Sequence, residues 1–130
     1  MDDLEPGTMQ GIVQNGKAAL DSATSEAAAA RIAVNARLSG DATRAYADTV
    51  ITDSESALAP IEGSFGGVDP PSKQEDDLRN QVFAVLGDVD DALSSARIAV
   101  RRDDRAGLAK AATDLATVLA SLGKLRESRG

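Results

Sequence analysis

The sequence predicts an all-α fold: an antiparallel up-down-up-down four-helix bundle built from a duplicated helical hairpin. Three observations predict it: four apolar stretches with helical spacing, an alanine-rich composition, and a pentapeptide that occurs twice. The 130-residue chain contains 24 alanines, but only one tyrosine, two phenylalanines and no tryptophan. Alanine has the highest helix propensity and a small side chain, so this composition favours long helices that pack closely.

Apolar or small residues recur at alternating steps of four and three, the spacing of the buried face of a packed helix. The first stretch is Met9, Val13, Gly16, Leu20, Ala23, Ala27, Ala30, Val34; the second is Ala47, Ile51, Ser54, Leu58, Ile61, Phe65; the third is Val82, Leu86, Val89, Leu93, Ala96, Val100; the fourth is Leu108, Ala111, Leu115, Val118, Leu122, Leu125. Each stretch needs a partner surface, and four of them predict one shared core.

Residues typical of turns and helix ends separate these stretches. Ser39-Gly40-Asp41 combines a helix-ending glycine with an aspartate that can cap the following helix, which predicts a tight turn. Glycines and prolines are concentrated in 63–71, the predicted main loop, and Pro60 should kink or end the second helix. The last turn falls within Arg102 to Gly107, where either of two aspartates can cap the fourth helix.

The capping box Ser72-Lys73-Gln74-Glu75 marks the start of the third helix. We therefore expect a single domain over 1–130, with the first hairpin at about 8–62, the loop at 63–71 and the second hairpin at about 72–127. Short turns make neighbouring helices antiparallel, so both short turns should lie at one end of the bundle.

The duplication is predicted from matches at one offset. Ala30 to Val34 recurs unchanged as Ala96 to Val100, 66 residues later. The same ungapped offset also pairs Ala18 with Ala84, Leu20 with Leu86, Ala45 with Ala111, and Asp48 with Asp114. Independent convergence on one helical pattern is the alternative explanation.

Composition excludes several classes of chemistry. The chain has no cysteine and no histidine, which excludes disulfides, thiolate zinc sites and the histidine ligands of di-iron bundles. Its net charge of −7 opposes binding to nucleic acid. No apolar run is long enough to cross a membrane. We expect no enzymatic activity and no cofactor.

Two charged features flank the apolar stretches. Arg31 and Asp48 should face each other across the first hairpin, and Arg97 and Asp114 across the second, as charge pairs that set the register of the helices. The turn segments 31–48 and 97–110 carry net charges of +1 and +3. This basic end is a candidate contact for an anionic partner, and its arginines are Arg37, Arg44, Arg97, Arg101, Arg102 and Arg105. Alternatively, these cations stabilise helix C-termini.

The isoleucines of the repeated pentapeptide should face outward. At about 100° per residue, Ile32 and Ile98 each lie on the side opposite their own apolar stretch. Around Ile32 the first helix carries small residues and little charge. Its candidate dimer face consists of Ala28, Ala29, Ile32 and Ala36.

Three segments, Ala42 to Asp48, Val68 to Pro71 and Ala96 to Leu108, occur in an order that resembles uncharacterised exported, lipoprotein-like helical-bundle proteins of high-GC Gram-positive bacteria. The resemblance covers most of 27–120 and implies a mature domain without its signal and anchoring cysteine. It implies no activity and no site residues.

We therefore expect a non-enzymatic protein-interaction or sensing module, displayed outside the membrane on an N-terminal anchor. One alternative is a bundle that binds a small ligand or a metal ion, and another is a dimeric scaffold in the cytoplasm. The expected partner is an unidentified protein or a second copy of the chain.

Overall fold

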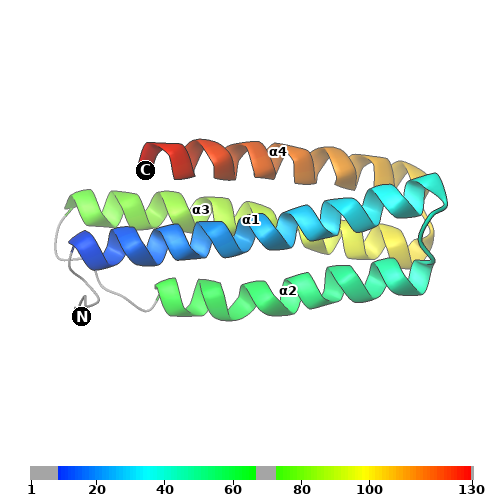
Figure 1. The fold of residues 1–130 in the computed structure, drawn as a ribbon, viewed down its shortest axis with the longest axis horizontal. Helices are drawn as coiled ribbons and strands as arrows, with labels where there is room; N and C mark the ends of the chain where they lie inside the picture. Colours follow the sequence, from blue (N-terminus) through cyan, green and yellow to red (C-terminus); the bar gives the residue numbers. More distant parts are fainter. Residues whose placement is uncertain (1–8, 67–72, 130) are drawn as a thin grey trace.

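The computed structural model describes residues 9–66 and 73–129, and within these ranges every regular element is an α-helix. The helices are α1 (Met9–Ser39), α2 (Arg44–Gly66), α3 (Lys73–Arg102) and α4 (Arg105–Arg129). They lie along a common long axis, with the α1–α2 and α3–α4 connections at one end (Figure 1). The start of α1 and the end of α4 lie at the other end.

The four apolar stretches form the core. Every member whose side chain is described is buried, except Ile61 and Leu125, which are half-buried near the far ends of α2 and α4. Each helix contacts both neighbours, and α1 also packs against α3 across the bundle, whereas α2 and α4 do not meet in the described part. The predicted all-α bundle is confirmed.

The buried positions of α1 and α3 follow the predicted offset. Over 16–39, where burial in α1 is described, all eight buried positions have a buried counterpart in α3, 66 residues later: 16, 19, 20, 23, 27, 30, 33 and 34 correspond to 82, 85, 86, 89, 93, 96, 99 and 100. Within the repeated pentapeptide, Ala30, Ala33 and Val34 are as buried as Ala96, Ala99 and Val100. The two copies therefore have matching surroundings.

The ungapped offset is wrong for the second helix of each hairpin. Ala45 is exposed, whereas its predicted counterpart Ala111 is buried. An offset of 64 restores the match, pairing the buried residues Ala47, Ile51, Ser54 and Leu58 with Ala111, Leu115, Val118 and Leu122. The reason is the length of the connections: 40–43 follows α1, but only 103–104 follows α3, which is two residues shorter.

Helix α2 runs further than predicted. It continues through Pro60 to Gly66, so Pro60 does not end it and the first part of the predicted 63–71 loop is helical. Pro60 is exposed, a site where solvent can satisfy the backbone carbonyl that loses its hydrogen bond. Ser72 of the predicted capping box lies outside the described residues.

Candidate functional site

The end of the bundle that carries both short connections, here called the turn end, begins where α1 and α3 stop. After α1, Gly40 has a φ of 84°, and the amide of Asp41 donates to the carbonyl of Ala36 at 2.8 Å. After α3, Asp103 adopts a similar φ of 54°, and the amide of Asp104 donates to the carbonyl of Ala99 at 3.0 Å. Both helices thus end in a left-handed residue that reverses the chain.

Helices α2 and α4 begin at side-chain caps. The amide of Tyr46 donates to Oγ1 of Thr43 at 3.1 Å, so Thr43 caps α2. The expectation that Asp41 caps this helix is wrong, because Asp41 lies too far before Arg44 and accepts instead from the Ser39 hydroxyl. Of the two aspartates left open for α4, Asp104 is the cap, accepting from the Gly107 amide at 3.0 Å.

Three of the six candidate arginines form ion pairs with acids. Arg37 pairs with Asp103 (2.9 Å), which joins the end of α1 to the second connection. Arg97 and Arg101 of α3 pair with Glu55 (2.8 Å) and Asp48 (2.7 Å) of α2. These pairs tie the first hairpin to the second.

The predicted charge pairs within each hairpin are therefore not formed. Asp48 pairs with Arg101 rather than Arg31, which is exposed and has no acid partner among the described residues. Arg97 pairs with Glu55, while Asp114 pairs with Lys110 one turn earlier on α4. The reason is that α2 packs against α3 as well as α1, and sequence spacing cannot tell which neighbour a flanking side chain meets. No pattern in the sequence identified Glu55 as a partner of Arg97.

The other three arginines pair with no acid among the described residues. Arg44 and Arg102 are exposed, and neither bonds to an acid in the described part of the chain. Arg105 is also exposed, and its Nη2 donates to the backbone carbonyl of Leu38 at 3.0 Å. This bond places a cation at the C-terminus of α1, as the alternative interpretation of the basic end expects, but it leaves the charge unneutralised.

A pocket of about 450 Å³ opens between the two connections. It is lined by Arg37, Leu38, Ser39, Gly40, Asp103, Arg105 and Leu108. Its wall includes two of the predicted contact residues, Arg37 and Arg105. The leucines and the backbone at Gly40 were not predicted, because they come together only when the two connections meet.

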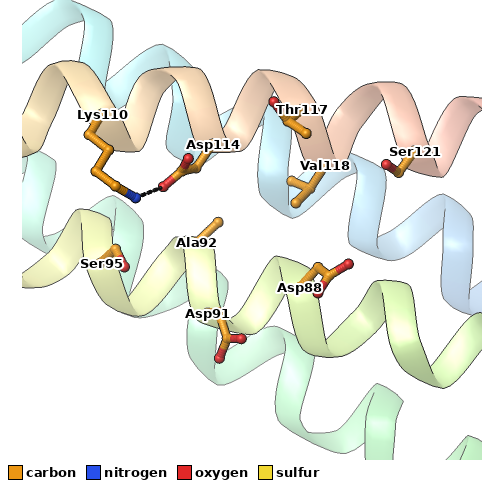
Figure 2. A pocket seen from close by; sticks show the side chains of 9 residues that line it. All are labelled: Asp88, Asp91, Ala92, Ser95, Lys110, Asp114, Thr117, Val118 and Ser121. Atoms are coloured by element: carbon orange, nitrogen blue, oxygen red, sulfur yellow. Dashed lines mark hydrogen bonds and ion pairs between the residues drawn. The ribbon is translucent and has the colours of Figure 1, made fainter.

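A second, more open pocket of about 310 Å³ runs between α3 and α4, and Figure 2 shows the side chains that line it. Lys110 forms an ion pair with Asp114 at 2.8 Å, and the side chain of Asp91 points away from α4. Its acids therefore do not converge on one point. Within the described ranges, no three potential ligands are grouped to hold a metal ion.

The outward orientation of the two isoleucines is confirmed: Ile32 is 70% exposed and Ile98 is 43% exposed. The neighbours of Ile32 in the predicted dimer face, Ala28, Ala29 and Ala36, are half-buried on α1. A role of this face in dimer formation stays a prediction.

In the described ranges, no helix contains an apolar stretch long enough to cross a membrane. Comparison of the chain with protein-family models, with curated proteins and with solved structures gave no match in any of the three.

Proposed function

We propose that this protein is a non-enzymatic interaction module whose turn end binds an acidic segment of a partner protein. The proposal rests on which of the six candidate arginines form ion pairs within the chain. Arg37, Arg97 and Arg101 are compensated by acids within the chain, whereas Arg44, Arg102 and Arg105 are exposed and pair with no acid among the described residues. Three such cations are available to a partner.

The charge distribution supports this end over the rest of the surface. The chain as a whole carries a net charge of −7, although its turn segments are basic. An acidic partner is repelled by most of the molecule and attracted at one end, which orients the encounter before contact. Arginine also presents several donors in a plane that matches a carboxylate.

We also propose an origin for the architecture: an up-down-up-down bundle made from two copies of one hairpin, with two residues lost or gained in a connection. The shared burial pattern, at 66 residues in α1 and α3 and 64 in α2 and α4, supports it. We propose as well that the protein is exported and anchored through its N-terminal side. The position of α1 supports this, because α1 begins at the end of the bundle opposite the turn end, so an anchor there would leave the turn end accessible (Figure 1).

The test is binding of a fluorescent glutamate hexapeptide, followed by anisotropy at low and at physiological ionic strength. The variant Arg44→Glu/Arg102→Glu/Arg105→Glu should lose binding. The matched control Lys17→Glu/Lys73→Glu/Lys124→Glu changes the net charge equally at exposed sites away from the turn end and should retain most of the binding. Affinity of the wild-type chain should fall as salt is added. Equal losses in both variants, or no binding by the wild type, would contradict the proposal.

A further inference from the structure

We propose that the pocket between the two connections binds one side-chain carboxylate of the acidic partner, with Arg105 as its charged contact. This inference rests on the proposed function and assigns the place where the partner is held most firmly. The pocket, lined by residues of both connections and of the flanking helix ends, is about 450 Å³, within the usual size of a binding pocket for a small group.

Arg105 is held in place without being neutralised. Its Nη2 bond to the Leu38 carbonyl (3.0 Å) joins the start of α4 to the last turn of α1 and orients the guanidinium at the pocket. A guanidinium has five N–H donors, and this bond uses one. The other donors bond to no described residue. A carboxylate can accept two of them in a planar, bidentate pair.

Arg37, the other cation of the pocket, has a different role. Its side chain is only 25% exposed, and it donates to Asp103 (2.9 Å) and to the carbonyl of Ala42 (3.3 Å). Its charge is compensated and its position is fixed by both connections. Arg37 therefore stabilises the wall of the pocket, and Arg105 is the cation that remains available to bind a carboxylate.

The apolar part of the pocket selects the kind of anion. Leu38 and Leu108 line it beside the charged groups; Leu38 is half-buried, whereas Leu108 is only 1% exposed. A small inorganic anion has no apolar atoms that could pack against this part of the pocket. A glutamate side chain places its methylene groups against Leu38 while its carboxylate meets Arg105, so both parts of the ligand gain contacts.

The experiment compares single variants with the C-terminally amidated glutamate hexapeptide as the probe. Arg105→Gln should weaken binding by about tenfold or more, the size expected for losing a hydrogen-bonded charge pair. The control Arg44→Gln removes an exposed arginine outside the pocket and should weaken binding by roughly two- to threefold. Arg105→Lys keeps the charge without the planar donors and should give an intermediate loss. Thermal melts check that each variant folds.

Amide NMR shifts locate the peptide directly. On titration of the wild-type chain, the amides of Ser39, Gly40 and Leu108 should move, and these shifts should vanish in Arg105→Gln. One outcome would overturn the pocket assignment and leave the proposed function standing. In that outcome, binding still depends on the three exposed arginines, but Arg105→Gln and Arg44→Gln cause equal losses and the pocket amides do not move. A glutamine hexapeptide with a free C-terminus that binds equally well would overturn the side-chain assignment. No binding of any peptide would overturn both.

Discussion

Glu55, like Asp48, is an acid of α2 that forms an ion pair with α3. Its carboxylate accepts from Nε of Arg97 at 2.8 Å and from the Ser94 hydroxyl at 3.1 Å. The Glu55 and Arg97 side chains are 19% and 30% exposed, so solvent screens this pair less than the pair of Lys110 and Asp114. A partly buried carboxylate that loses its cation retains most of its desolvation cost.

We predict that Arg97→Met lowers the free energy of unfolding by about 1–2 kcal/mol, because Glu55 is left with only the Ser94 hydroxyl. Lys110→Met is the matched control. It breaks an i,i+4 pair whose side chains are 74% and 36% exposed, and it should cost less than about 0.5 kcal/mol. Urea denaturation of both variants measures the difference. Equal effects would show that burial of Glu55 contributes nothing.

At the scale of the helices, the ends are specified by single residues with particular backbone requirements. Gly40 ends α1 with a φ of 84°, a conformation that is costly for any residue with a Cβ atom. Gly107 has a steric requirement instead: a Cβ placed there would lie 2.7 Å from Oδ2 of Asp104 and 3.1 Å from Cβ of Ala99. Gly87 and Gly123 have neither requirement, since a Cβ at either position meets nothing within 4 Å.

We predict opposite signs for four alanine substitutions. Gly87→Ala and Gly123→Ala should each stabilise the protein by about 0.5–1 kcal/mol, because both positions are helical and open. Gly40→Ala should cost about 1 kcal/mol through its backbone conformation. Gly107→Ala should cost about 1 kcal/mol by displacing the capping Asp104. Thermal melts of the four variants test this ranking, and stabilisation by Gly40→Ala would contradict the assigned end of α1.

Across the whole molecule, α1 and α3 are the two helices that meet across the bundle, and the described part of the buried face of α1 is made almost entirely of small residues. Over 16–39, the described part of that face, Gly16, Ala19, Ala23, Ala27, Ala30 and Ala33 are buried, with only Leu20 and Val34 as larger buried side chains. Helices α1 and α3 each contact all three other helices, whereas α2 and α4 do not meet in the described part. Small side chains allow helices to approach closely, so the alanines permit the contact of α1 with α3.

We predict that Ala27→Leu destabilises the protein by about 1–3 kcal/mol or more, since the residue is fully buried and the added carbon atoms must force helices apart. Ala18→Leu makes the same change at an exposed position of α1 and should remain within about 0.5 kcal/mol of the wild type. Denaturant titrations compare the two. A neutral Ala27→Leu would indicate an empty space beside α1.

The sequence by itself determined the class of fold and the inner and outer face of each helix. Leu20, Leu86 and Leu115 are buried and Ile32 is exposed because the α-helical period alone fixes which side chains share a face. The glycine at the end of α1 was equally readable, because its requirement is local.

Only the tertiary structure decided which helices meet through their flanking charges. Arg97 pairs with Glu55, and Arg37 pairs with Asp103, and both pairs join one hairpin to the other. The sequence could not predict them, because each helix has more than one neighbouring helix and the helical period does not indicate which neighbour a residue beside the apolar stretch faces. For the same reason, the sequence did not predict the pocket beside Arg105. Its walls are brought together by two connections that lie far apart in the sequence and differ in length by two residues.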